Sequence, residues 1–380
     1  MRCLPVALLV ICGFGCEGCG KRTTTPATTP AEAEPEPPPD PVGAAVAYFK
    51  QLGGSFTTSG STVTDVRLEG EKIRDEDLAR LAAFTDVKAV TVRAPNVTEA
   101  GLAHLAPLKT LEVVILYGNG ITDAVLKHLA ALPALRELYL IDAWVSDAGM
   151  PHVAQMKTLT KLVVRHSRVT DAGLPALAEL PALDTLEVSA APVTDEGAAP
   201  IAKIGTLTNL DLSRLLITNA GLKTIAPLKG LRVLNLTGTA VTDSGMRDLA
   251  GFTHLEMLVL DQTAVGDAGL AHLAPLGELR TLRLDATRVT DEGAASVAGH
   301  AGLKQLSLAR TAIGDAAVER LKTLAKLELL ILSGTGVSDD SVKALAAFKD
   351  LRWLLLANTK VTPAGVGELK QMLPNCEIDR

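Results

Sequence analysis

The stretch LRVLNLTGTAVTDSGMRDLAGF, residues 231–252, contains the unit from which most of the chain is built. The leucines at 231, 234 and 236 follow the pattern L-x-x-L-x-L, whose last part alternates leucine with a variable residue. This alternation predicts a short strand with the leucines facing inward. Threonine and aspartate at 242–243 favour a helix start, where a side-chain oxygen accepts an unpaired backbone N–H. Apolar residues at every third position of 246–252 then predict one buried stripe on a short helix.

The pattern V/I-T-D-x-G at the centre of this unit recurs every 24 residues, with no insertion or deletion. Its first apolar residue stands at thirteen positions: Ile73, Val97, Ile121, Val145, Val169, Val193, Ile217, Val241, Val265, Val289, Ile313, Val337 and Val361. A fixed period of roughly 20–29 residues indicates a solenoid of strand-plus-helix units. Stacked neighbours bury the apolar face that one unit cannot bury alone.

These units resemble the leucine-rich repeat family from Val63 to about Arg380. The resemblance implies an α/β fold: a leucine-rich repeat solenoid curved like a horseshoe, with a parallel sheet on the concave face and short helices on the convex face. I-T-N-A-G-L at Ile217–Leu222 is similar to the I-T-D-x-G-L of the cysteine-containing, F-box-associated subtype. That subtype has a longer unit, and the sequence contains no F-box, so a ubiquitin-ligase role is not implied.

Threonine stands where that subtype has cysteine or asparagine, at Thr239, Thr263, Thr287, Thr311, Thr335 and Thr359. We expect this stacked threonine to hydrogen-bond backbone groups of adjacent coils. Most earlier repeats have an apolar residue instead, at Pro95, Ala143, Ala191 and Leu215. The ladder should therefore be weaker in the N-terminal half.

Both ends of a solenoid need caps that cover the exposed core. We predict an N-terminal helical cap over residues 42–61, repeats over 62–372, and a C-terminal cap, resembling a truncated repeat, over 373–380. Cys376 in this last segment is expected to be a semi-buried thiol. His300 occupies a position that is leucine or phenylalanine in the neighbouring repeats, so we expect a buried or edge-facing neutral histidine.

The composition suits a large aliphatic core and argues against some classes of partner. The chain has 380 residues, of which 47% are hydrophobic and only 3% aromatic. A formal net charge of -6 and a pI near 5.7 argue against nucleic-acid binding through a basic surface. Beyond the first twenty residues no apolar run approaches the ~20 residues that span a bilayer.

Residues 1–16 predict a signal peptide, with a positive start and a short apolar run. Gly15-Cys16 resembles the lipobox of bacterial lipoproteins, in which Cys16 would carry the lipid and become the mature N-terminus. Cys12 and Cys19 are alternative lipidated residues.

Residues 17–41 are rich in proline, threonine and glutamate and predict a disordered tether. Together with the lipobox they predict an exported, membrane-anchored lipoprotein of the cell envelope, periplasmic or surface-facing. Ordinary secretion and an uncleaved anchor helix are the alternatives.

The variable positions of the strands should face the concave surface, where apolar side chains are not needed for folding. In the early repeats these positions and the following turn form a first patch: Val113, Ile115, Tyr117, Tyr139, Ile141, Val163 and Trp144. The middle repeats are polar and acidic. The last repeats form a second patch: Leu329, Ile331, Trp353 and Leu355. Contiguous exposed apolar and aromatic groups mark interaction sites, although the C-terminal cap could equally cover the second patch.

Four histidines share one slot on the predicted helices: His104, His128, His152 and His272. Two of them could bridge a metal ion, but no cysteine or carboxylate completes a site, so we expect surface histidines, no metal and no cofactor. The sequence contains no G-x-S-x-G, no H-E-x-x-H and no Gly-rich phosphate loop. We therefore predict that the chain is not an enzyme.

The sequence as a whole predicts a non-catalytic scaffold, exported and tethered to the envelope, that binds a protein partner on its concave face. One alternative is a structural envelope protein that associates with itself. An enzyme with a concave-face site is a further alternative, which would require a convergent histidine, cysteine or carboxylate pair.

Overall fold

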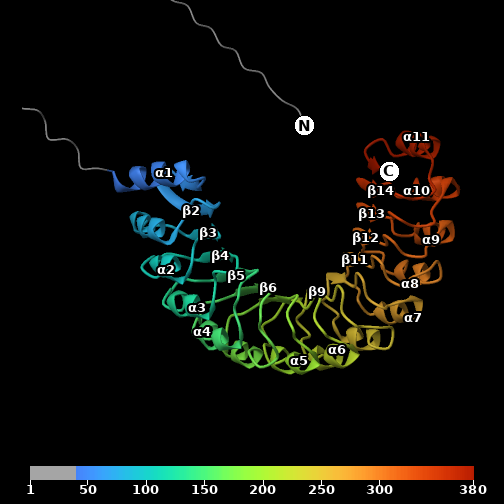
Figure 1. Cartoon of the computed structure of the whole chain (residues 1–380). Coiled ribbons are helices and arrows are strands. Elements are labelled where there is room, and N and C mark those ends of the chain that lie inside the picture. Colours follow the sequence, from blue (N-terminus) through green and yellow to red (C-terminus); the bar gives the residue numbers. More distant parts are fainter. Residues whose placement is uncertain (1–39) are drawn as a thin grey trace, which may run out of the picture. The chain divides into compact units, whose positions relative to one another are not determined.

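The structure, a computed structural model, describes residues 40–380, so the predicted signal peptide and nearly all of the tether lie outside the described residues. Residues 40–380 form a curved solenoid with one sheet on its inner side and short helices on its outer side (Figure 1). The predicted leucine-rich repeat architecture is thereby confirmed. In this range no helix is long and apolar enough to cross a membrane.

The strands lie in the sheet in the order in which they follow one another along the chain. Their bounds are β1 Ser55–Ser59, β2 Thr62–Glu69, β3 Ala89–Arg93, β4 Val113–Tyr117, β5 Glu137–Ile141, β6 Lys161–Arg165, β7 Thr185–Ser189, β8 Asn209–Asp211, β9 Val233–Asn235, β10 Met257–Val259, β11 Thr281–Arg283, β12 Gln305–Ser307, β13 Leu329–Ile331, β14 Trp353–Leu355 and β15 Glu377–Asp379.

The convex side is covered by single short helices, some of them 3-10. The α-helices are α1 Pro41–Gln51, α2 Glu99–Leu102, α3 Asp123–Leu129, α4 Met150–Val153, α5 Asp195–Ile201, α6 Asn219–Ile225, α7 Asp267–Leu270, α8 Ala294–Val297, α9 Asp315–Leu321, α10 Val342–Leu345 and α11 Pro363–Met372. The 3-10 helices are η1 Asp75–Ala83, η2 Ala103–Leu105, η3 Asp147–Gly149, η4 Leu174–Glu179, η5 Met246–Gly251, η6 Ala271–Leu273 and η7 Asp339–Ser341.

From β2 onward the strands are parallel, and each residue pairs with the residue 24 positions further along. Leu258 of β10, for example, lies between Leu234 of β9 and Leu282 of β11, and all three side chains are fully buried. The leucines of successive repeats therefore stack in rows that run the length of the solenoid. Because every repeat contributes to the same rows, the core is one continuous aliphatic cluster.

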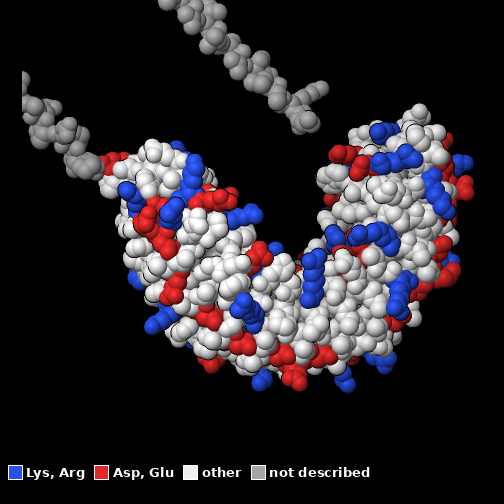
Figure 2. All heavy atoms as spheres, in the orientation of Figure 1, with Lys and Arg blue, Asp and Glu red and all other residues white. Residues whose placement is uncertain are grey.

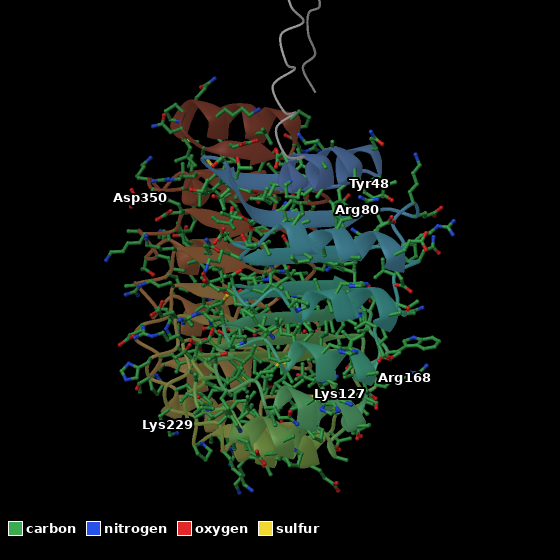
Figure 3. The ribbon with its side chains drawn as sticks, turned by 90° about the vertical axis from the view of Figure 1, so that its left-hand side faces the viewer. Tyr48, Arg80, Lys127, Arg168, Lys229 and Asp350 are labelled. Carbon is green, nitrogen blue, oxygen red and sulfur yellow. The ribbon has the colours of Figure 1, made fainter. Side chains whose placement is uncertain are left out.

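The N-terminal end departs from the expectation of an entirely parallel sheet. The predicted cap segment forms α1 and, in addition, β1, which pairs antiparallel with β2. Phe49 of α1 packs against Phe56 and Phe84, with ring centroids 6.4 and 6.5 Å away. Tyr48 donates a hydrogen bond to Asp77 and lies under Arg80, whose guanidinium carbon is 4.0 Å from the ring centroid (Figure 3). Aromatic rings thus close the core where no repeat precedes it.

At the other end β15 adds one parallel strand beside β14. Cys376, just before β15, is buried, and its burial raises the pKa of the thiol. His300 is buried among leucines, as one of the two sequence interpretations expected, and burial lowers the pKa of its imidazole. Each of these groups is therefore held in its neutral form near pH 7.

A ladder of hydrogen bonds joins successive repeats at the helix starts. The carboxylate of Asp147 accepts from the backbone N–H and from the hydroxyl of Thr170, both at 2.7 Å. Thr170 in turn accepts from the N–H of Ala172 at 3.2 Å and so caps its own helical turn. The expectation that both residues cap the helix is corrected: the threonine caps, and the aspartate ties one repeat to the next. The same pair of bonds joins Asp75–Thr98, Asp123–Ser146, Asp171–Thr194, Asp195–Thr218, Asp267–Thr290, Asp315–Ser338 and Asp339–Thr362.

The glycine of V/I-T-D-x-G follows from this ladder. A Cβ added at Gly173 would lie 2.5 Å from the carboxylate oxygen of Asp147, so a side chain there would displace the carboxylate.

Four junctions depart from this pair of bonds. Asn219 replaces the aspartate at one, and Gly266 and Gly314 replace the hydroxyl residue at two others. At the fourth, Glu99 replaces the aspartate and pairs with His128 at 3.5 Å. In the repeat that follows, Val125 stands in the glycine's place and is fully buried. Ala317 and Ser341 also stand in the glycine's place, and there the carboxylates of Asp291 and Asp315 keep their bonds to the next repeat, so glycine is favoured at this position but not required.

Strand length divides the solenoid into a first half, β3–β7, with five-residue strands, and a second half, β8–β14, with three-residue strands. In the second half a threonine follows most strands, as at Thr263, whose hydroxyl donates to the carbonyl oxygen of Leu260 at 2.7 Å. The same bond recurs at Thr239, Thr287, Thr311, Thr335 and Thr359. The prediction that these threonines bond adjacent coils is wrong, since each bonds three residues back within its own coil.

Candidate interaction surface

The concave face is built from strand residues that alternate with the buried leucines. In β9, for example, Val233 and Asn235 are partly exposed on either side of the buried Leu234. The loops on the two edges of the sheet carry different residues. In Figure 3, Arg168, from a loop that follows a strand, lies at one edge, while Lys229 and Asp350, from loops that precede strands, lie at the opposite edge.

Five residues of the first patch are placed as the sequence predicts, on the concave face of β4 and β5. Their side chains are partly exposed: Val113, Ile115, Tyr117, Tyr139 and Ile141. The strands pair Ile115 with Tyr139 and Tyr117 with Ile141, so aromatic and aliphatic groups alternate on adjacent strands. Beside Tyr117 a hollow of about 670 Å³ opens toward Gly53, Glu69 and Asp142.

Both tyrosines are flanked by cations. The guanidinium carbon of Arg93 lies 5.5 Å from the ring centroid of Tyr117, and Nζ of Lys161 lies 5.1 Å from that of Tyr139. The hydroxyl of Tyr139 donates to Glu137 at 2.7 Å, and partial burial raises its pKa. These contacts orient the rings on the sheet face while leaving part of each exposed.

Val163 is the member of the first patch that the structure places differently. It is only 1% exposed, because it lies between Tyr139 and Glu187 on the neighbouring strands, and longer side chains cover it. Alternation along the strand identified the correct face for Val163, but not the height of its neighbours. Val163 therefore packs under the exposed side chains of the first patch.

Trp144 lies on the edge loop, 48% exposed, with the guanidinium carbon of Arg168 at 4.4 Å from its ring centroid. Leu216, which is 64% exposed, was not predicted as part of this surface. Leu216 has the same register position as Trp144, immediately before the apolar residue of V/I-T-D-x-G, three repeats further along. An apolar residue at that register position is the signal that could have identified it.

A second hollow, of about 440 Å³, lies in the middle of the concave face, and we call it the central hollow. It is lined by Lys161, Thr185, Leu186, Glu187, Asn209, Leu210, Asp211, Val233, Asn235, Thr237, Met257, Val259, Asp261 and Arg283. Acidic and basic side chains both line it, and on the face shown in Figure 2 both signs of charge occur along the arc.

The second patch is not covered by the C-terminal cap, because β15 extends the sheet edge without folding over its face. Trp353 is 46% exposed, and Leu329, Ile331 and Leu355 are partly exposed. Of the two sequence interpretations, the one in which the cap buries this patch is therefore wrong. The concave face carries apolar side chains near both ends and polar side chains between them.

The four helix histidines lie on the convex side. His104 and His272 are exposed, whereas His128 and His152 are partly buried. Within residues 40–380 no three histidine, cysteine, aspartate or glutamate side chains gather closely enough to hold a metal ion.

Comparisons with known proteins agree with this architecture. Residues 155–178 and 231–250 match a family model described as Leucine Rich repeat. An internalin (inlF) from Listeria monocytogenes has a solved structure that matches with a TM-score of 0.61 and 20% sequence identity, covering 90% of this chain and 94% of that one. A leucine-rich repeat protein from Leptospira interrogans matches with a TM-score of 0.48 and 16% identity, covering 83% and 90%. No curated protein matches the chain in sequence.

At this level of identity the likeness to the internalin shows the fold alone. The chain therefore has the leucine-rich repeat fold.

Proposed function

We propose that this chain is a non-catalytic scaffold that binds a protein partner on its concave face, with the first patch as the main contact. The observation that carries the proposal is the presence of Tyr117, Tyr139 and Ile141, partly exposed, on a sheet face that the core does not need. The inward side chains Leu116 and Leu140 complete the packing of these strands.

Rigid aromatic side chains are effective anchors because they bury a large area with little loss of conformational entropy. The exposed Trp144 extends the same surface onto the edge loop. The second patch provides a further contact for a partner long enough to reach across the concave face. Self-association is the alternative use of the same surfaces.

We further propose that the scaffold is exported and held at the cell envelope by a lipid on Cys16. This proposal rests on the sequence of residues 1–41, which combines a signal-like start, Gly15-Cys16 and a proline-rich tether. Replacing Cys16 with Ser should abolish acyl labelling and release the protein from membranes. Unchanged membrane retention of the C16S variant would favour an uncleaved anchor helix instead.

The binding proposal is tested with the paired change Tyr117→Ala and Tyr139→Ala. Loss of aromatic anchors costs ~2 kcal/mol or more, so recovery of a specifically captured envelope protein should fall by about 30-fold. The unfolding free energy should change little, because neither ring belongs to the core. Capture by the wild type and the variant is compared by quantitative mass spectrometry, and self-association by light scattering.

The matched control is Leu116→Ala with Leu140→Ala on the same two strands. Both leucines are fully buried, so each truncation leaves a cavity and costs about 3–5 kcal/mol of stability. This pair should lower the unfolding midpoint strongly, whereas the tyrosine pair should not. If the tyrosine pair changes neither the captured protein nor the self-association, the first patch is not the binding site.

A further inference from the structure

The central hollow combines three acidic and two basic side chains with an apolar wall. Glu187 of β7 and Asp211 of β8 occupy paired register positions on adjacent strands, so their side chains lie side by side on the concave face. Val233, Met257 and Val259 line the hollow further along the sheet. Its volume of about 440 Å³ is far larger than a single ion needs.

The acidic groups of this region differ in how their charge is compensated. Glu187 is paired with Arg165, and Arg283 lies 2.7 Å from Asp261 and 3.3 Å from Asp285. Asp211 instead accepts hydrogen bonds from two neutral donors, the N–H of Ser213 at 2.8 Å and the amide of Asn235 at 2.7 Å. Among the described residues, no ion pair includes Asp211.

The surroundings of Asp211 disfavour the ionised form of its carboxyl group. Burial raises the pKa of this carboxyl, and the nearby Glu187 raises it further, while the bonds from Ser213 and Asn235 act in the opposite direction. Arg165 also attracts Asp211, but its guanidinium is engaged by Glu187. Lys161, which also lines the hollow, and Arg165 both attract Glu187, so Asp211 is the carboxylate of this pair without an ion-pair partner, and it would be stabilised by a further cation placed in the hollow.

We propose that the central hollow binds an arginine side chain of the protein partner, with the guanidinium on Asp211 and Glu187 and the methylene stem against Val233, Met257 and Val259. A guanidinium is planar and can bond two carboxylates at once, and its stem packs on apolar surface while its head stays hydrated. This inference rests on the proposed function and specifies the partner's chemistry: a basic residue next to apolar groups that contact the first patch.

The test uses a small probe rather than the partner. The purified repeat protein, labelled at its methionine and valine methyl groups, is titrated with n-butylguanidinium and, separately, with the neutral isostere n-butylurea, followed by NMR. We expect n-butylguanidinium to shift the methyl signals of Met257, Val233 and Val259 with saturation, and n-butylurea to bind at least about ten-fold more weakly.

Two variants and one control locate the binding. D211N and E187Q should each weaken n-butylguanidinium binding by about ten-fold, and the use of two variants guards against one that folds poorly. D65N removes a carboxylate from the concave face of β2, away from the hollow, and should leave binding unchanged. Equal binding of the two probes, no shift of these methyl signals, or unchanged binding in both D211N and E187Q would each overturn the inference.

The probe titration and the capture experiment can fail independently of each other. If the probe fails to bind while Tyr117→Ala and Tyr139→Ala still abolish partner capture, the scaffold function stands and the arginine site does not. If the probe binds as expected but the tyrosine pair has no effect on capture, the hollow is a cation site and the first patch is not the partner surface. A calcium titration that shifts the same signals more strongly than n-butylguanidinium would contradict the choice of an organic cation.

Discussion

The first half, β3–β7, and the second half, β8–β14, share one core but differ in the turn that follows each strand. Strands are five residues long in the first half and three in the second, although the leucine rows continue unchanged through both. In the second half the threonine hydroxyl, as in Thr263, donates a hydrogen bond to the carbonyl oxygen of the leucine that directly follows the strand. At β8 the side chain of Asp211 instead accepts a hydrogen bond from the N–H of Ser213.

This difference shows that separate residues control separate features. The leucines fix the period and the parallel register, whereas a single polar side chain per repeat accompanies the early end of the strand. Most concave positions belong to neither set, although Asp211 also bonds its turn. Apolar residues in the first half give way to charged, polar and apolar ones around the central hollow without any change in the core. These positions are therefore free to carry a binding site.

The junction ladder runs through both halves and should give the largest effect. Asp123→Ala removes two hydrogen bonds from a carboxylate to Ser146, at 2.7 and 2.6 Å, and should lower the unfolding free energy by about 2–3 kcal/mol. Asp315→Ala in the second half, which loses bonds of 2.8 and 2.7 Å to Ser338 and a further bond from the Ser341 hydroxyl, should cost at least as much. Urea denaturation followed by circular dichroism measures both.

Glu99→Ala is the matched control for this ladder. Glu99 occupies the aspartate position but pairs with His128 at the protein surface, and exposed pairs contribute less than about 1 kcal/mol. A loss in E99A as large as in D123A would show that the ladder does not stabilise the junctions.

The sequence predicts the fold well because its strongest signals are periodic. The thirteen-fold register from Ile73 to Val361 predicts the parallel sheet, and the alternation in each strand places Tyr117 and Tyr139 on the concave face. It does not predict the burial of Val163, which depends on the side chains of two neighbouring strands. The antiparallel β1 was missed because the first strand lies outside the repeat pattern.

The carboxylate ladder could not be predicted for a different reason. A threonine-aspartate pair at a helix start is compatible both with capping within one repeat and with bonding to the next repeat. Only the distance from Asp147 to Thr170, 23 residues further along, distinguishes the two. The preference for glycine was visible in the motif, but its cause, the close approach of the preceding repeat's carboxylate at Gly173, needed the structure.

Replacing the threonine of the turn should give the next largest loss of stability. This change directly tests the comparison between the two halves. Thr263→Val keeps the size of the buried side chain but leaves the Leu260 carbonyl without its bond, so we expect a loss of about 1–2 kcal/mol. Ala191→Thr at the equivalent position in the first half should change the unfolding free energy little, because the strands there are five residues long and do not end in the turn that this bond accompanies. If Ala191→Thr stabilises as much as Thr263→Val destabilises, the halves do not differ in turn geometry.

His300 gives the second half a pH-sensitive core position where neighbouring repeats have Leu276 and Leu324. Burial lowers the pKa of His300, and a bond to the backbone of Leu276 opposes this only in part. The stability from the neutral imidazole is therefore fully present above its unfolded pKa, about 6.5, and is lost as pH falls through the folded pKa, with a slope of at most about 1.4 kcal/mol per pH unit. His300→Leu should remove this slope.

Urea midpoints of the wild type and H300L at pH 8 and pH 5 test this expectation. The difference between the two proteins isolates His300, since the other six histidines are common to both. A wild-type-minus-variant difference that is the same at both pH values would show that the imidazole titrates as if exposed.

The smallest expected effect tests whether the two halves share backbone strain where the strand ends. Ala190 in the first half and Ala286 in the second occupy the same register position, with φ of 50° and 54°, a left-handed conformation that is unfavourable for alanine. Glycine adopts this conformation without strain, and Gly118, Gly238 and Gly334 already do so at equivalent positions. Ala190→Gly and Ala286→Gly should therefore each stabilise the protein, by less than about 1 kcal/mol once the greater freedom of glycine in the unfolded chain is subtracted.

The control for this last prediction is Ala47→Gly, at an exposed position inside α1, which should instead cost about 1 kcal/mol. Thermal unfolding of the three variants shows whether each change raises or lowers the stability. Equal gains at Ala190 and Ala286 would mean that the left-handed residue is a fixed feature of the repeat and that the halves differ only in the residues around it. A gain in one half alone would show instead that the change in strand length alters the backbone strain at the turn.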